Sequence, residues 1–139
     1  MSEQQVAESQ VKEEEKKEEG LVDILHKYPS APSQDQIEQW KTEFGEVFVS
    51  GFSEEHLYIW RPISRPEWVQ LQAVASNPEA EMTQYRFEEM ICDTCVLWKS
   101  VNIPWAKGKA GTPTSLQEQI LQNSDFLSPQ AASLLVAKL

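Results

Sequence analysis

The sequence has no long apolar run, and this shortage excludes one class of protein at the outset. Its longest uninterrupted stretches of apolar residues are only a few residues long. A membrane-spanning helix needs roughly 20 consecutive apolar residues, so no span is expected. The first residues are polar and acidic, unlike a signal or transit peptide. We therefore expect a cytoplasmic protein.

Histidine and cysteine are scarce, with two of each in 139 residues. The cysteines form the pair Cys92-Asp-Thr-Cys95, while His26 and His56 lie far from them along the chain. A structural zinc site needs four ligands, and no second cysteine pair is present. A thioredoxin-like site would place its first cysteine at a helix N-terminus, whereas this pair falls within a predicted helix. Core cysteines in a reducing compartment are the favoured interpretation, and we expect no metal and no cofactor.

The sequence also lacks a pattern typical of catalysis. Gly108–Thr112 does not match the phosphate-binding pattern G-x-x-x-x-G-K-[ST], and no strong strand precedes it. Glu88, Glu89 and Asp93 fall on one side of a predicted helix, where a solvated face is the simpler interpretation. No histidine or nucleophile is paired with them. We expect that the protein is not an enzyme.

Negative charge is plentiful and is concentrated at the N-terminus. The formal net charge is −10, and residues 1–20 carry seven glutamates against three lysines. So few apolar residues lie in this segment that burial cannot offset the cost of ordering it. We therefore predict a disordered acidic tail at residues 1–20 and a single domain at residues 21–139. An acidic chain repels phosphate, which disfavours unaided binding to nucleic acid or anionic lipid.

Helical signals dominate the predicted domain. Ser33 and Ser64 each begin a capping box, the pattern that opens an α-helix. Apolar residues at intervals of three and four predict a long helix from about Glu79 to Trp98. Thr112 and Ser128, each followed by proline, predict the starts of two more helices.

One β-hairpin is predicted between residues 46 and 60, where two runs are rich in β-branched and aromatic residues. The predicted fold is therefore mainly α with a small β-hairpin, an α+β class. A two-stranded ribbon is marginal alone, so it must pack on helices or pair with another chain. An uncovered edge would invite the addition of a partner's strand.

The most unusual composition lies in Tyr58–Trp68, which contains Trp60, Arg61, Arg65 and Trp68. Tryptophan and arginine dominate protein-interface hot spots, and aromatic residues among arginines can also stack on bases. A third interpretation is structural, with the tryptophans anchoring the hairpin and the arginines bridging acidic helices. Because these arginines lie on an acidic chain, we hypothesise that the four residues bind a partner protein.

A resemblance to a known group of proteins rests on four segments. Tyr58–Trp68 has an aromatic-Arg-Pro strand end, Ile91–Trp98 a Cys-x-Leu-Trp helix end, and Ala110–Ile120 a Gly-x-Pro-x-x-Leu helix start, followed by Ser124-Asp-Phe126. This order resembles small virion-assembly proteins of contractile-tailed bacteriophages, over residues 45–126. Tail-assembly chaperones, neck proteins and baseplate proteins all fall within the resemblance.

The resemblance implies a function but supplies no active site. It implies a non-enzymatic protein-interaction component of a phage tail or virion, acting as an assembly chaperone or a structural protein. The partner would be another tail or virion component, with no direct contact to nucleic acid or membrane, and oligomerisation stays open. The location would be the host cytoplasm during assembly, or the virion. The alternatives are a host-directed regulatory or adaptor protein and, less favoured, a small enzyme. If the arginines prove internal, the next candidate interface is the Val101–Gly111 loop.

Overall fold

The computed structural model of the protein describes residues 20–53 and 55–139. The predicted acidic tail lies outside these residues, except for Gly20. Residues 20–26 are helical. The remaining elements, in chain order, are α2 (Gln34–Phe44), β1 (Phe48–Ser53), β2 (His56–Trp60), α3 (Arg65–Ala75), η1 (Pro78–Ala80), α4 (Gln84–Cys95), β3 (Val96–Lys99), η2 (Trp105–Lys107), α5 (Gly111–Gln122) and α6 (Pro129–Leu134).

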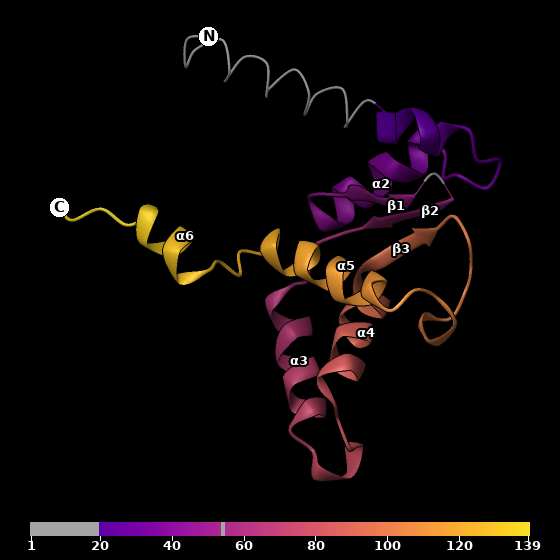
Figure 1. Ribbon diagram of the computed structural model, residues 1–139. Coiled ribbons are helices and arrows are strands. Elements are labelled where there is room, and N and C mark those ends of the chain that lie inside the picture. The colour runs from indigo at the N-terminus through magenta and orange to yellow at the C-terminus, as the bar shows by residue number, and fades with distance from the viewer. Residues whose placement is uncertain (1–19, 54) are drawn as a thin grey trace, which may run out of the picture.

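A three-stranded antiparallel sheet of order β1-β2-β3 lies at the centre of the fold, with helices on both of its faces (Figure 1). Alternate side chains of β2 point to opposite faces. Tyr58 and Trp60 pack with buried residues of α3, α4 and α5. Leu57 and Ile59 pack with Leu25 of the first helix and with side chains of α2. The structure confirms the predicted mainly α fold with a small β-sheet.

The predicted helix from Glu79 to Trp98 is wrong at both ends. Its first part is the 3₁₀ turn η1, and Thr83 caps α4 by accepting a hydrogen bond from the amide of Arg86. The chain leaves the helix at Cys95 and continues directly into β3. Val96 already has extended backbone angles, and β3 pairs with β2. The predicted hairpin is therefore two strands of a three-stranded sheet.

The capping box predicted at Ser64 forms in full, whereas at Ser33 the structure shows one of its two bonds. Ser64 accepts a hydrogen bond from the amide of Glu67, and the Glu67 carboxylate accepts one from the amide of Ser64. Ser33 accepts a hydrogen bond from the amide of Gln36 at the start of α2. Gly45 ends α2 with a φ of 87°, a conformation that glycine adopts without strain.

The C-terminal helix α6 is short and extends away from the sheet and the other helices (Figure 1). Four apolar side chains at and beyond its end are strongly exposed, namely those of Leu134, Leu135, Val136 and Leu139. A search for membrane-spanning helices among residues 20–53 and 55–139 finds none of sufficient length and apolar character.

Candidate functional site

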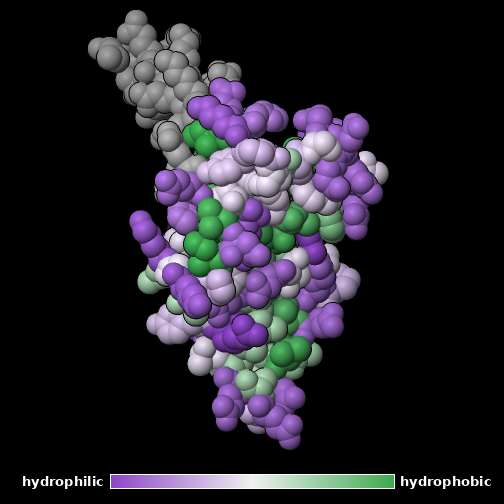
Figure 2. Space-filling view, turned by 90° about the vertical axis from the view of Figure 1, so that its right-hand side faces the viewer, coloured by the Kyte–Doolittle hydropathy of each residue, from purple (hydrophilic) through white to green (hydrophobic). Residues whose placement is uncertain are grey.

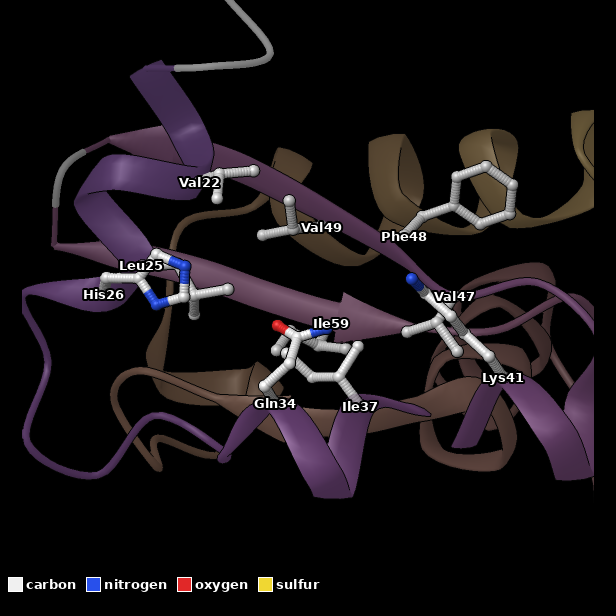
Figure 3. A pocket seen from close by; sticks show the side chains of 10 residues that line it. All are labelled: Val22, Leu25, His26, Gln34, Ile37, Lys41, Val47, Phe48, Val49 and Ile59. Atoms are coloured by element: carbon white, nitrogen blue, oxygen red, sulfur yellow. The ribbon is translucent and has the colours of Figure 1, made fainter. Parts of the chain in front are cut away.

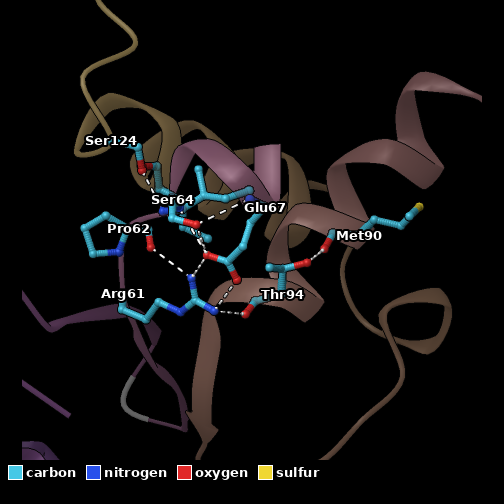
Figure 4. A network of polar contacts seen from close by, with 9 residues as sticks. Arg61, Pro62, Ser64, Glu67, Met90, Thr94 and Ser124 are labelled. Carbon is cyan, nitrogen blue, oxygen red and sulfur yellow. Dashed lines mark hydrogen bonds and ion pairs between the residues drawn. The ribbon is translucent and has the colours of Figure 1, made fainter. Parts of the chain in front are cut away.

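The Arg61 side chain joins three elements where β2 ends (Figure 4). Its Nη2 donates to Glu67 Oε2 at 2.7 Å and to the carbonyl of Thr94 at 3.0 Å. Its Nη1 donates to Glu67 Oε1 and to the carbonyl of Pro62, the latter at 3.1 Å. The guanidinium thus connects the end of β2 to the first turn of α3 and to the last turn of α4. Arg61 is only 7% exposed.

The contacts around Arg61 have the character of an internal brace. The pKa of Glu67 is lowered from 4.5 to about 2, chiefly because Arg61 donates hydrogen bonds to its carboxylate. The guanidinium also lies 4.6 Å from the centre of the Phe44 ring, so α2 is drawn into the same contact. These bonds occupy most of the donors that a partner's carboxylate would need.

Trp60 is also interior, with 2% of its surface exposed. Its ring stacks on that of Phe48 at 4.6 Å, and its Nε1 donates to Ser50 Oγ at 2.8 Å. The hydroxyl of Ser50 donates in turn to Gln119 of α5. Trp60 therefore anchors β2 to β1 and to α5. Trp60 and Arg61 are therefore arranged as the structural interpretation expects. Both side chains are buried, so neither presents a surface to a partner.

Arg65 and Trp68, the other two residues of the partner-binding hypothesis, lie nearer to solvent. Arg65 is exposed in the first turn of α3, and Trp68 is partly buried. The Trp68 ring packs on Phe126 at 4.5 Å and on Phe87 at 5.6 Å. A shallow pocket of about 220 Å³ lies beside them. Arg65 and Trp68 both line this pocket.

A larger and more apolar pocket, of about 230 Å³, lies on the other face of the sheet (Figure 3). It is enclosed by the helix at residues 20–26, by α2, and by β1 with β2 behind it. Its lining consists of Val22, Leu25, His26, Gln34, Ile37, Lys41, Val47, Phe48, Val49 and Ile59. We name it the β1 pocket. No sequence motif indicates this pocket, because its lining comes from several separate segments.

Strand β1 forms one edge of the sheet beside this pocket. Within the described residues, β1 pairs only with β2. The helix at residues 20–26 packs very closely over it, since a Cβ added at Gly51 would lie 2.6 Å from Leu21 Cδ2. Glycine therefore lets this helix approach the strand and close one end of the β1 pocket.

A third pocket, of about 50 Å³, lies between the β1–β2 turn and the predicted Val101–Gly111 loop. We name it the loop pocket. Its lining includes Phe52, Tyr58 and Trp105. The space-filling view faces the side of the molecule on which this loop lies (Figure 2). Apolar residues reach this face in separate patches between polar residues, rather than as one continuous area.

The carboxylates predicted to form a solvated helix face do not all face solvent. Glu88 is 4% exposed and accepts a hydrogen bond of 2.6 Å from Thr114 Oγ1 of α5. Asp93 accepts one of 2.8 Å from Trp105 Nε1. The solvated-face prediction is wrong for Glu88, because α5 packs against α4 at this position. Both carboxylates hold other parts of the chain against α4.

Cys92 and Cys95 lie in the core with none of their surface exposed. Burial, the largest cause, raises the pKa of each thiol to about 12. The Cys92 thiol donates to the carbonyl of Pro113 at 3.5 Å. Among the residues that the structure describes, no three histidine, cysteine, aspartate or glutamate side chains gather as metal ligands would.

Comparisons with protein-family models, with curated proteins and with solved structures find no match for this chain.

Proposed function

We propose that this protein is a non-enzymatic protein-interaction component of a bacteriophage tail or virion, acting as an assembly chaperone or as a structural protein. The virion setting comes from the resemblance across residues 45–126. The interaction role is carried by one observation, the β1 pocket beside strand β1, which within the described residues pairs with β2 alone.

An edge strand and an adjoining apolar pocket suit the binding of an extended peptide. The outer edge of β1 offers main-chain amides and carbonyls to a partner's strand, and alternate side chains of that strand would point towards the pocket. The main-chain bonds would supply affinity, and the apolar lining would select bulky side chains. The existing helices fix the shape of the pocket, which reduces the entropy cost of binding.

The chemistry of the β1 pocket supports binding rather than catalysis. The side chains that line it include no carboxylate, thiol or hydroxyl group. His26 and Lys41 are its titratable groups, and they lie at opposite ends of the pocket (Figure 3). General acid–base catalysis needs a pair of groups within reach of one reacting atom, and this pocket does not offer such a pair.

Site-specific crosslinking tests the proposal. A photoreactive amino acid would replace Val22, which lines the β1 pocket and is 43% exposed. The matched control replaces Val69 on α3, which is 51% exposed and lines none of the three pockets. We expect a crosslink from position 22, and not from position 69, to a single tail or virion protein in phage-producing cells.

The crosslinking results separate the competing functions. A crosslink to a virion protein in finished particles indicates a structural component, and one found only before particles are complete indicates a chaperone. A crosslink to a host protein alone would replace the proposal with the host-directed adaptor. Equal labelling from both positions would show that the β1 pocket has no specific occupant.

A further inference from the structure

The stretch from the last turn of α4 to the middle of α5 has a charge opposite to that of the chain as a whole. From Thr94 to Gln117 there is no acidic residue, while the segment holds three lysines, Lys99, Lys107 and Lys109. The net charge of the chain is −10. The segment therefore forms a local basic region, and it contains the predicted Val101–Gly111 loop.

The basic segment folds over the loop pocket. Three aromatic rings that contact one another in series line one side of it. Phe52 meets Tyr58 edge to face at 5.8 Å, and Tyr58 meets Trp105 at 5.6 Å. The remaining lining is contributed by Ser53, His56, Ile103, Pro104, Gly108, Lys109 and Thr112. The lining thus combines apolar side chains with those of His56 and Lys109.

Trp105 is held in place from two directions, so this wall exists before any ligand binds. Its Nε1 donates to Asp93 at 2.8 Å, and the Lys99 ammonium lies 3.8 Å from the centre of its ring. The ammonium on the ring is a cation–π contact that also keeps a positive charge beside the loop pocket. A preorganised aromatic wall is the feature that anchors an inserted side chain at a protein interface.

We infer that the loop pocket binds an acidic peptide segment of a partner protein, with one compact apolar side chain of that segment, such as leucine, packed against the partly exposed ring of Phe52. The acidic groups on either side would meet Lys107 and Lys109. Opposite charges would attract this segment to Lys107 and Lys109, and the negative net charge of the chain disfavours its binding at acidic faces.

The geometry favours a peptide over a nucleic acid. Base stacking needs an open aromatic face. Lys99 covers one face of Trp105, and Tyr58 packs against the same ring. The surrounding chain is acidic, so phosphates beyond the three lysines would be repelled.

This inference rests on the proposed function, because it treats the protein as a binder of other proteins, but it uses different residues. Tyr58 of the loop pocket and Ile59 of the β1 pocket belong to opposite faces of β2. A failure of crosslinking at Val22 would therefore leave peptide binding at the loop pocket unaffected, and the reverse also holds.

The first test measures the electrostatic part of binding. The probe is a fluorescein-labelled peptide of alternating glutamate and aspartate with one central leucine, and the readout is fluorescence anisotropy. We expect Lys107→Glu with Lys109→Glu to weaken binding by about tenfold. The control is Lys27→Glu with Lys138→Glu, which changes the net charge equally at exposed lysines that line none of the three pockets. It should weaken binding by less than about twofold. Equal losses in the two variants would overturn the inference.

The second test measures the apolar part. Replacing the leucine of the probe with serine should weaken its binding to the wild-type protein, and Phe52→Ser should remove most of this difference. Phe52 is 38% exposed, so its replacement leaves the core intact. Val69→Ser is the matched control and should preserve the preference for leucine. A preference unchanged by Phe52→Ser would overturn the inference, as would tighter binding of oligothymidine than of the peptide through the same lysines.

Discussion

The Arg61 guanidinium and the Glu67 carboxylate form a two-bond ion pair that closes the junction between β2, α3 and α4. The same carboxylate accepts the amide of Ser64 and so completes the capping box of α3. One glutamate thus fixes both the start of a helix and the orientation of a buried arginine. The corner between β2 and α3 is rigid because the same Glu67 carboxylate accepts the bonds of both the ion pair and the capping box.

The first prediction contrasts the two arginines of this corner. Arg61→Ala leaves Glu67 without its partner and should lower the free energy of unfolding by about 3 kcal/mol. Arg65→Ala should change it little, because Arg65 is exposed. Urea denaturation of the two single variants measures the difference. Equal destabilisation by both would show that Arg61 is not the brace described here.

The second prediction concerns acid. The pKa of Glu67 is lowered from 4.5 to about 2, chiefly because Arg61 donates hydrogen bonds to the carboxylate. A group whose pKa is lower in the folded state stabilises the protein above its unfolded pKa and loses that effect as the pH falls. The contribution should therefore disappear between pH 4.5 and about pH 2.

In Glu67→Gln the free energy of unfolding should fall less across this range of pH than it does in the wild type. The matched control is Glu38→Gln on α2, where the carboxylate is exposed. Unfolding by urea at a series of pH values gives the comparison. If Glu67→Gln and the wild type lose stability in parallel, the ion pair does not set the pKa of Glu67.

Local signals in the sequence predicted local structure well. The capping residues Ser33 and Ser64 act within one helical turn, so their spacing alone located the starts of α2 and α3. Strand β3 could not be found in this way. Trp98 continues the helical spacing of Phe87, Ile91 and Cys95, yet it lies in β3, whose extended conformation depends on pairing with β2. Tertiary pairing overrides the local pattern there.

The candidate site was predicted less well, for the same physical reason. The composition of Tyr58–Trp68 marked this corner as unusual, but composition does not show which side chains are enclosed. Arg61 is enclosed partly by Thr94, which lies far along the chain. No motif in the sequence indicates the β1 pocket. The Val101–Gly111 loop, the next candidate interface, stays a prediction, and an aromatic pocket lies beside it.

A third prediction tests how Trp60 is held. Ser50→Ala removes the acceptor of the Trp60 indole N–H, which is buried with the rest of that side chain. A buried donor without an acceptor should lower the free energy of unfolding by about 1–3 kcal/mol. Ser115→Ala, at an exposed position of α5, is the control and should have a small effect. A neutral result for Ser50→Ala would mean that another acceptor replaces the hydroxyl.

The last prediction concerns the two cysteines. Both thiols are fully enclosed and burial raises the pKa of each to about 12, so almost no thiolate exists at pH 8. The folded protein should therefore react with a thiol reagent such as dithionitrobenzoate only at the rate of unfolding. Both thiols should react at once in concentrated guanidinium chloride. Rapid reaction of one thiol in the folded protein would show that α4 or α5 opens without global unfolding.

Substitution of the cysteines should reveal their packing. Cys92→Ser and Cys95→Ser each place a hydroxyl in the core, at a cost on the order of 1–2 kcal/mol. The cost should be smaller at Cys92, because the carbonyl of Pro113 already accepts a hydrogen bond from its thiol. Urea denaturation of the two variants shows which substitution lowers the free energy of unfolding more. Elemental analysis of the wild type independently tests the interpretation that the cysteines bind no metal. Near-stoichiometric zinc that is lost in either variant would show that the cysteines are ligands, since a buried hydroxyl explains a loss of stability but not a loss of metal.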